Sequence, residues 1–230
     1  MGVTANTTAK LTSQHGLFYN YLINNFSQGF AKKYLEANEN AINLAKSIIA
    51  KENIDCDFEK KDAYVYTKIE SELHKIKEEI DSLQLLDFEA EFVDRINLPF
   101  DVLGAIKFKN QAQFHPLKYL ISTLNYLEKT SCNLYEDSKV IDVKMDNGNY
   151  NVITEEYTVN AKYVVLATHY PIINFPGLHF LKMYQDRSYI IAVQTKEALF
   201  DGMYISSESP EFSFRTAIFN DERLLLVAGR

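Results

Sequence analysis

Apolar side chains recur every three or four residues between positions 17 and 49 of the chain. The pattern begins at Leu17, and a break near Gly29 divides it into two stretches. A repeat of this length places apolar side chains along one face of an α-helix. The pattern therefore predicts two amphipathic helices, over residues 16–26 and 28–52.

The pattern then changes to short runs that are rich in aromatic and β-branched residues. We expect strands where polar turns bound such runs, and a helix in the one charged stretch that keeps the helical repeat. The predicted elements are strands at 56–59 and 63–67 joined as a hairpin by the polar turn 60–62, a helix at 69–83, and strands at 88–94 and 105–109.

A helix that opens at Pro116 and runs to Lys129 precedes a strand-rich second half. Asn147-Gly148 is the signal of a tight hairpin turn, and the continuous apolar run 162–168 is typical of a strand buried on both faces. The other predicted strands lie at 133–135, 139–145, 150–154, 156–159, 188–195, 203–206, 212–219 and 224–228. The sequence thus predicts an α+β fold with a small β-meander and a separate antiparallel sheet.

Composition narrows the classes of function. The chain has 230 residues and a net charge of -7, and it interleaves basic with acidic residues, whereas nucleic-acid binding needs clustered Lys and Arg. No apolar run reaches the roughly 18 residues of a membrane span. Cys56 and Cys132 stand outside any cysteine–histidine cluster, so we expect no metal site. A reduced, cytoplasmic chain is the simpler interpretation, and a single disulfide is the alternative.

The order of the predicted elements resembles the flavoproteins of the glycine and D-amino acid oxidase family. In that family a loop of small residues follows the ribose-binding acid, a helix leads into a β-meander, and a buried strand ends in Ala-Thr-Gly near the FAD. The matching segments here are Gly2-Val3-Thr4-Ala5-Asn6-Thr7-Thr8-Ala9-Lys10, Phe114-His115-Pro116-Leu117, Ser138-Lys139-Val140-Ile141 and Val164-Val165-Leu166-Ala167-Thr168-His169.

The resemblance implies a FAD-dependent oxidoreductase that removes hydride from the C–N bond of an amine or amino acid. The cofactor carries the redox chemistry in such enzymes, so few catalytic side chains are needed. The resemblance further implies a FAD-proximal loop and helices at 1–53, parts of a substrate domain at 54–112 and 173–230, and part of a FAD-binding domain at 113–172.

The same resemblance implies which residues border the cofactor and the substrate. The expected cofactor-binding residues are Thr7, Thr8, Ala9, Val140, Ala167 and Thr168. The substrate-side candidates are His15, Arg187 and Arg215, because a guanidinium can bind a substrate carboxylate through two parallel hydrogen bonds. The alternatives are a capping or surface histidine and two exposed strand arginines.

Parts of the family pattern do not occur in the chain. None of the eight glycines forms the Gly-x-Gly-x-x-Gly turn that holds a pyrophosphate at a helix N-terminus, and His169 stands at the last position of the Ala-Thr-Gly strand end. The family's closing glycine-rich FAD segment would follow Arg230. We therefore expect a central fragment that binds FAD weakly or not at all alone. The alternative hypothesis is a non-enzymatic α+β interaction module without a cofactor.

Overall fold

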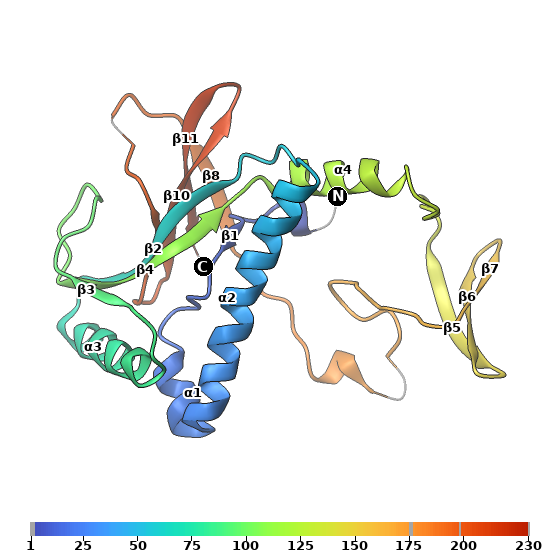
Figure 1. Ribbon diagram of the computed structural model, residues 1–230, viewed down its shortest axis with the longest axis horizontal. Helices are drawn as coiled ribbons and strands as arrows, with labels where there is room; N and C mark the ends of the chain where they lie inside the picture. Colours follow the sequence, from blue (N-terminus) through green and yellow to red (C-terminus); the bar gives the residue numbers. More distant parts are fainter. Residues whose placement is uncertain (1–2, 175–176, 198, 230) are drawn as a thin grey trace. The chain divides into compact units, whose positions relative to one another are not determined.

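The structure, a computed structural model, describes residues 3–174, 177–197 and 199–229. The chain forms two compact units (Figure 1). The first unit combines Met1–Tyr126 with Ser188–Arg230, and the second is formed by Leu127–Arg187. Segments far apart in the sequence therefore build one unit, and each unit is described separately below.

A single large sheet organises the first unit. Its strand order is β1-β4-β2-β9-β10-β11-β8, with β3 also paired to β4. All pairs are antiparallel except β2 with β9, which is parallel. The strands are β1 (Lys10–Leu11), β2 (Glu59–Thr67), β3 (Glu91–Val93), β4 (Gly104–Gln113), β8 (Tyr189–Val193), β9 (Met203–Ser206), β10 (Phe212–Phe219) and β11 (Glu222–Gly229).

The expected hairpin at 56–67 is wrong. One continuous strand, β2, replaces it, and a register shift against β4 between Lys61 and Ala63 marks a β-bulge. A bulge adds a residue without reversing the chain, so it tolerates the polar stretch that resembled a turn in the sequence. The Lys61 amine lies 2.9 Å from the Glu59 carboxylate, and the negative charge of Glu59 offsets the positive charge of Lys61 within the sheet.

Four helices belong mainly to this unit: α1 (Tyr19–Asn25), α2 (Gln28–Lys51), α3 (Glu70–Leu85) and α4 (Pro116–Leu127). The predicted break between the first two is confirmed, because the Ser27 side chain caps α2 by accepting a hydrogen bond from the Phe30 N–H at 3.1 Å. The short 3-10 helix η1 (Val3–Ala5) precedes β1.

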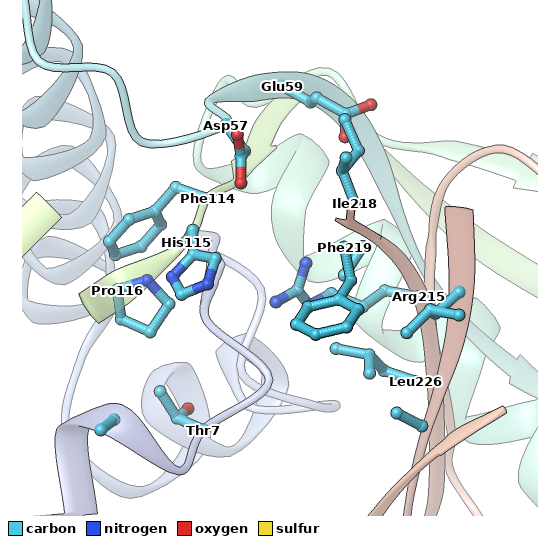
Figure 2. A pocket seen from close by; sticks show the side chains of 14 residues that line it. Thr7, Asp57, Glu59, Phe114, His115, Pro116, Arg215, Ile218, Phe219 and Leu226 are labelled. Atoms are coloured by element: carbon cyan, nitrogen blue, oxygen red, sulfur yellow. The ribbon is translucent and has the colours of Figure 1, made fainter. Parts of the chain in front are cut away.

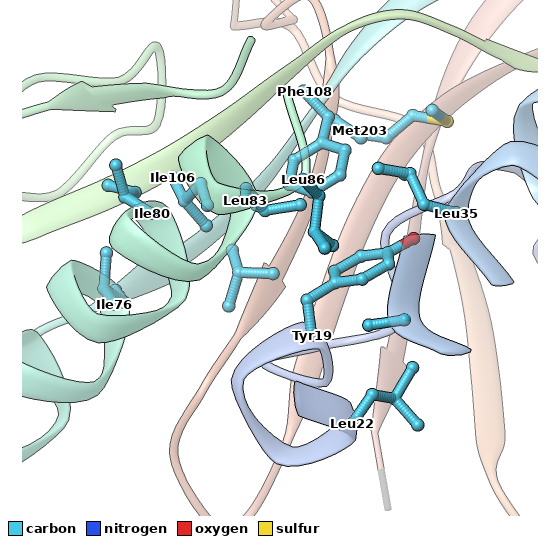
Figure 3. Close-up of a cluster of buried hydrophobic side chains, with 13 residues drawn as sticks. Tyr19, Leu22, Leu35, Ile76, Ile80, Leu83, Leu86, Ile106, Phe108 and Met203 are labelled. Carbon is cyan, nitrogen blue, oxygen red and sulfur yellow. The ribbon is translucent and has the colours of Figure 1, made fainter. Parts of the chain in front are cut away.

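The hydrophobic core lies between three of these helices and one face of the sheet. Figure 3 shows side chains of α1, α2 and α3 meeting those of β4 and β9. Side chains alternate between the faces of a strand, so Val65 joins this core while its neighbours Tyr64 and Tyr66 pack on the opposite face. There the Tyr64 and Tyr204 rings stack with centroids 4.8 Å apart.

A buried carboxylate fixes the start of α1 against α3. Glu79 of α3 is 1% exposed and accepts hydrogen bonds, each of 2.8 Å, from the backbone N–H groups of Phe18, Tyr19 and Asn20. These are N–H groups of a helix N-terminus, which lack partners within the helix. Burial raises the pKa of Glu79, and the three backbone hydrogen bonds oppose that shift.

The second unit contains a three-stranded antiparallel meander of β5 (Val140–Asp146), β6 (Asn149–Thr154) and β7 (Thr158–Ala161), followed by the 3-10 helix η2 (His179–Leu181). The predicted hairpin turn is confirmed: Asn147 and Gly148 both have positive φ, 49° and 82°. The predicted strand at 133–135 is wrong, because those residues are irregular and exposed.

The predicted buried strand at 162–168 is also wrong in this chain. These residues form no strand, and Val165 is 86% exposed. A strand buried on both faces needs a neighbouring strand and covering side chains. Among the described residues no strand pairs with this run, so its apolar side chains face solvent.

Candidate functional site

A pocket of about 220 Å³ opens on the face of the sheet formed by β8, β10 and β11. All of its walls belong to the first unit. One wall is the sheet, a second is the loop around Ala5 and Thr7, and a third is the entry to α4 at His115 (Figure 2). The pocket thus brings the small-residue loop and the α4 entry, two segments of the sequence resemblance, together with Arg215.

Strand pairing explains the chemistry of the sheet wall. Arg215 and Ala217 alternate along β10 and lie opposite Leu226 and Leu224 of β11, while Ala192 of β8 extends the same row. Small and aliphatic side chains make this wall apolar. Arg215 is therefore a single cation set in a surface of alanine and leucine.

Arg215 is buried, with 5% of its surface exposed. Figure 2 shows its guanidinium extending from the sheet toward His115. One Nη donates to the Thr216 carbonyl oxygen at 3.1 Å, and Nε has no hydrogen-bond partner among the described residues. Burial lowers the pKa of Arg215 to about 10, and attraction to Glu59 opposes this shift. A buried donor without a partner is costly unless a ligand satisfies it.

Glu59 does not neutralise Arg215 by direct contact. Its carboxylate is engaged by Lys61 at 2.9 Å and by the Arg223 guanidinium at 3.1 Å. Burial opposes ionisation of this carboxyl, yet the bonds from those two cations lower the pKa of Glu59. Within the described part of the chain, no carboxylate forms an ion pair with Arg215.

A second cation lies on the same side of the sheet. The Lys10 amine donates to the Tyr204 carbonyl oxygen at 2.9 Å and lies 2.7 Å from the Ser213 hydroxyl. Burial and the charge of Arg215 lower the pKa of Lys10 to about 7, against an attraction from Glu211. Lys10 is therefore partly neutral near pH 7.

The loop before β1 is held in a constrained turn beside the pocket. The Thr7 hydroxyl accepts a hydrogen bond from the Ala9 N–H at 3.2 Å, and Ala9 is buried with φ of 44°. Positive φ is uncommon for a residue with a side chain and indicates a constrained turn. Small side chains and an adjoining apolar wall fit one part of a flavin nucleotide.

The structure brings only some of the expected site residues together. Thr7, Thr8, Ala9 and Arg215 belong to the first unit, and Thr7 and Arg215 both line the pocket. His15 also belongs to that unit but is exposed, and its ring lies 3.2 Å from the Asn38 side chain outside the pocket. Val140, Ala167, Thr168 and Arg187 belong to the second unit, where the last three are exposed.

Sequence reasoning assigned no role to Lys10 or Asp57. Lys10 is the last residue of the small-residue loop, and only the folded chain shows that its amine contacts Tyr204 and Ser213. Asp57 lines the pocket with one carboxylate oxygen 2.7 Å from Lys118 and the other without a described partner. Its positive φ of 50° is a backbone feature that the sequence signals only weakly.

None of the helices in the described part of the chain is long and apolar enough to cross a membrane. No group of three or more His, Cys, Asp or Glu side chains in the described ranges is arranged to hold a metal ion.

Comparison with known proteins agrees with this arrangement. YhfW of Bacillus subtilis (strain 168), which carries the provisional name of a Rieske 2Fe-2S iron-sulfur protein, is 35% identical over 228 residues. The match covers 99% of this chain and 45% of YhfW, so the chain spans about half the length of this relative.

Solved structures show the same fold at low sequence identity. Glycine oxidase from Bacillus cereus ATCC 14579 matches with a TM-score of 0.68 at 16% identity, over 99% of this chain and 61% of that one. L-amino acid deaminase from Proteus vulgaris matches with a TM-score of 0.69 at 13% identity, over 97% of this chain and 51% of that one.

The match to a protein family covers almost the whole chain. The sequence pattern of the FAD dependent oxidoreductase family DAO matches residues 1–229, which is nearly the whole chain. The resemblance inferred from the order of elements is therefore confirmed, and so is the α+β fold. The chain belongs to the DAO family of FAD-dependent oxidoreductases.

Proposed function

We propose that this chain is part of a FAD-dependent oxidoreductase that oxidises the C–N bond of an amino acid. The observation that carries the proposal is the Arg215 guanidinium, buried in an apolar pocket with an unsatisfied donor and no ion-pair partner among the described residues. A carboxylate satisfies such a group better than water does, because charge-assisted bonds to a planar guanidinium are strong and directional.

The pocket residues are proposed to serve both the cofactor and the substrate. In the first unit, Thr7, Thr8 and Ala9 are the proposed FAD contacts, and Thr7 lines the pocket. For the second unit, the resemblance implies FAD contacts at Val140, Ala167 and Thr168. FAD, when bound, supplies the acceptor for the hydride. The chain's own residues orient the substrate through Arg215 and exclude water through the alanine and leucine wall of the sheet.

Two parts of the sequence interpretation remain proposals. Following the resemblance, residues 1–53 are assigned to a FAD-proximal loop and helices, and residues 113–172 to part of the FAD-binding domain. Residues 54–112 and 173–230 are assigned to parts of the substrate domain. A cytoplasmic location is consistent with Cys56 and Cys132, which are both free thiols.

Flavin binding tests the proposal directly. Quenching of FAD fluorescence is measured with this chain and with a chain extended by the neighbouring coding sequence to the length of its relatives. We expect tight binding by the extended chain and weak binding by this one. If neither chain binds FAD, the cofactor assignment fails and the interaction-module hypothesis replaces it.

Replacing Arg215 tests the substrate assignment. In the FAD-loaded extended chain, Arg215→Gln should lower kcat/KM for flavin reduction by amino acids about 100-fold, since charge-assisted hydrogen bonds to the substrate carboxylate are lost. Amines that lack a carboxylate should be affected less than about threefold. The readout is anaerobic bleaching of flavin absorbance.

Arg95→Gln is the matched control, because Arg95 is exposed and does not line the pocket. It should leave kcat/KM unchanged for both substrate classes. An equal loss for amino acids and simple amines in Arg215→Gln would contradict carboxylate binding by this residue.

A further inference from the structure

Two carboxylates line the pocket, and they differ in how far their oxygens are already occupied. Glu59 is engaged by Lys61 and by the Arg223 guanidinium. Asp57 has one carboxylate oxygen 2.7 Å from the Lys118 amine, whereas the other, Oδ2, is buried and has no hydrogen-bond partner among the described residues. A buried acceptor without a partner is costly, so Asp57 presents an oxygen that a ligand would satisfy.

The backbone holds Asp57 in place at the pocket before any ligand binds. The Cys56 carbonyl oxygen accepts a hydrogen bond of 2.7 Å from the His115 N–H, which joins the loop before β2 to the entry of α4. Asp57 itself has a φ of 50°, a left-handed conformation that Asp and Asn adopt more readily than most residues with side chains. A group that is positioned in advance loses less entropy when a ligand binds to it.

The pocket presents opposite charges on different walls. Arg215 extends from β10, and Asp57 lies just before β2 (Figure 2). The Nε donor of Arg215 and the Oδ2 acceptor of Asp57 both lack a described partner, so neither side chain satisfies the other. Because both residues line the same pocket, a ligand that fills it contacts both. Such a ligand needs an anionic group for the guanidinium and a cationic donor for the carboxylate.

The remaining space suits a small dipolar molecule. The pocket volume is about 220 Å³, below the roughly 300–1,000 Å³ of sites for drug-sized ligands. The sheet wall contributes Ala192, Ala217 and Leu226, whose side chains have no polar atom. A charged group that enters beside this wall loses water, so it needs a partner of opposite charge.

We propose that Asp57 binds the ammonium group of a substrate whose carboxylate is held by Arg215, so that the pocket selects dipolar amino acids. The inference rests on the proposed function for the identity of the substrate and adds the residue that recognises its charged nitrogen. The subsite binds the dipolar ion and involves no proton transfer. A carboxylate that lacks an ammonium group leaves Asp57 without a partner, and an amine that lacks a carboxylate does the same to Arg215, so the pocket disfavours both.

A matched ligand series tests this subsite without any flavin. Glycine, β-alanine, γ-aminobutyrate and δ-aminovalerate place the ammonium group at increasing distances from the carboxylate. Propionate, butyrate, valerate and caproate carry a methyl group in its place. Binding to this chain is measured from chemical shifts in proton–nitrogen NMR spectra, including the Arg215 Nε–H signal, which is assigned by its loss in Arg215→Gln. We expect at least one amino acid to bind about 30-fold more tightly than its matched carboxylate.

Three variants locate the origin of this preference. Asp57→Asn should abolish it while leaving the affinity for the carboxylates unchanged or higher, because Asn keeps the shape and tolerates the positive φ. Asp55→Asn is the matched control and should keep the preference, since Asp55 carries the same charge on the same loop but is exposed and does not line the pocket. Lys118→Met removes the cation that competes for Asp57, so it should at least keep the preference.

The outcomes separate this inference from the proposed function. The proposal is overturned if no amino acid binds more tightly than its matched carboxylate, or if Asp57→Asn keeps the preference. An equal loss in Asp55→Asn or Lys118→Met also overturns it, because the effect would then come from the charge or the structure of the loop. Flavin reduction in the FAD-loaded extended chain tests the proposed function separately. If amino acids reduce the flavin while Asp57→Asn keeps the preference, only this inference fails. If the preference depends on Asp57 but no amino acid reduces the flavin, the binding subsite stands and the proposed function fails.

Discussion

At the scale of single residues, two basic side chains of the first unit, Arg215 and Lys10, lie on one side of the sheet, and the sequence drew attention only to Arg215. Arg215 could be identified from the sequence because an arginine among apolar strand residues places a charge where a charge is costly to bury. Lys10 could not, because a lysine at the end of a polar loop is ordinary. Its environment depends on Tyr204 and Ser213, about two hundred residues away in the chain. No local pattern encodes a contact of that kind.

The burial of Lys10 predicts a pH-dependent stability. Its pKa is about 7 in the folded chain and 10.5 in the unfolded chain, so the unfolded state binds more protons between these values. The free energy of unfolding should therefore rise with pH in this window, by at most about 1.4 kcal/mol per unit from this group. Urea denaturation at pH 7.5, 8.5 and 9.5 measures it. The difference between wild type and Lys10→Met should grow with pH, and a constant difference would show that Lys10 is charged in the folded chain.

At the scale of elements, helices were predicted well and the details of the sheet less so. The helical repeat and the Ser27 cap are local, and so are the Asn147-Gly148 turn and the Pro116 helix start. The bulge in β2 is not local, because it is defined by the register against β4. The parallel pairing of β2 with β9 likewise joins strands that are far apart in the sequence.

The Glu79 carboxylate gives a prediction at this scale. Glu79→Gln keeps the size of the side chain but turns an amide toward backbone N–H groups that need acceptors. We expect the free energy of unfolding to fall by about 2–3 kcal/mol, since buried donors lose their partner. Glu78→Gln is the neighbouring control: Glu78 pairs with His74 on the exposed surface of α3 and should cost less than about 0.5 kcal/mol. Equal effects of the two substitutions, by urea denaturation, would contradict the capping role.

At the scale of the whole molecule, the two units differ in what holds them together. The first has a core of fully buried side chains, such as Val65 and Ile106. In the second, none of the described residues between 127 and 187 is buried, and Tyr163 and Val165 are 76% and 86% exposed. The sequence predicted burial for this run because its composition is that of a buried strand. The composition of a segment shows which environment suits it, but its side chains are buried only when a neighbouring strand or helix covers them.

This difference predicts unequal protection from hydrogen exchange. Amides of β2 and β4 should exchange with free energies near that of global unfolding, and those of 162–168 within seconds, because exchange is slow only where hydrogen bonds and packing must open together. Two valines serve as a matched pair. Val65→Asp should unfold the first unit, since Val65 is 0% exposed, whereas Val165→Asp should change the free energy of unfolding by less than about 0.5 kcal/mol. Slow exchange at 162–168 in this chain, or a large cost for Val165→Asp, would show that this apolar run is covered after all.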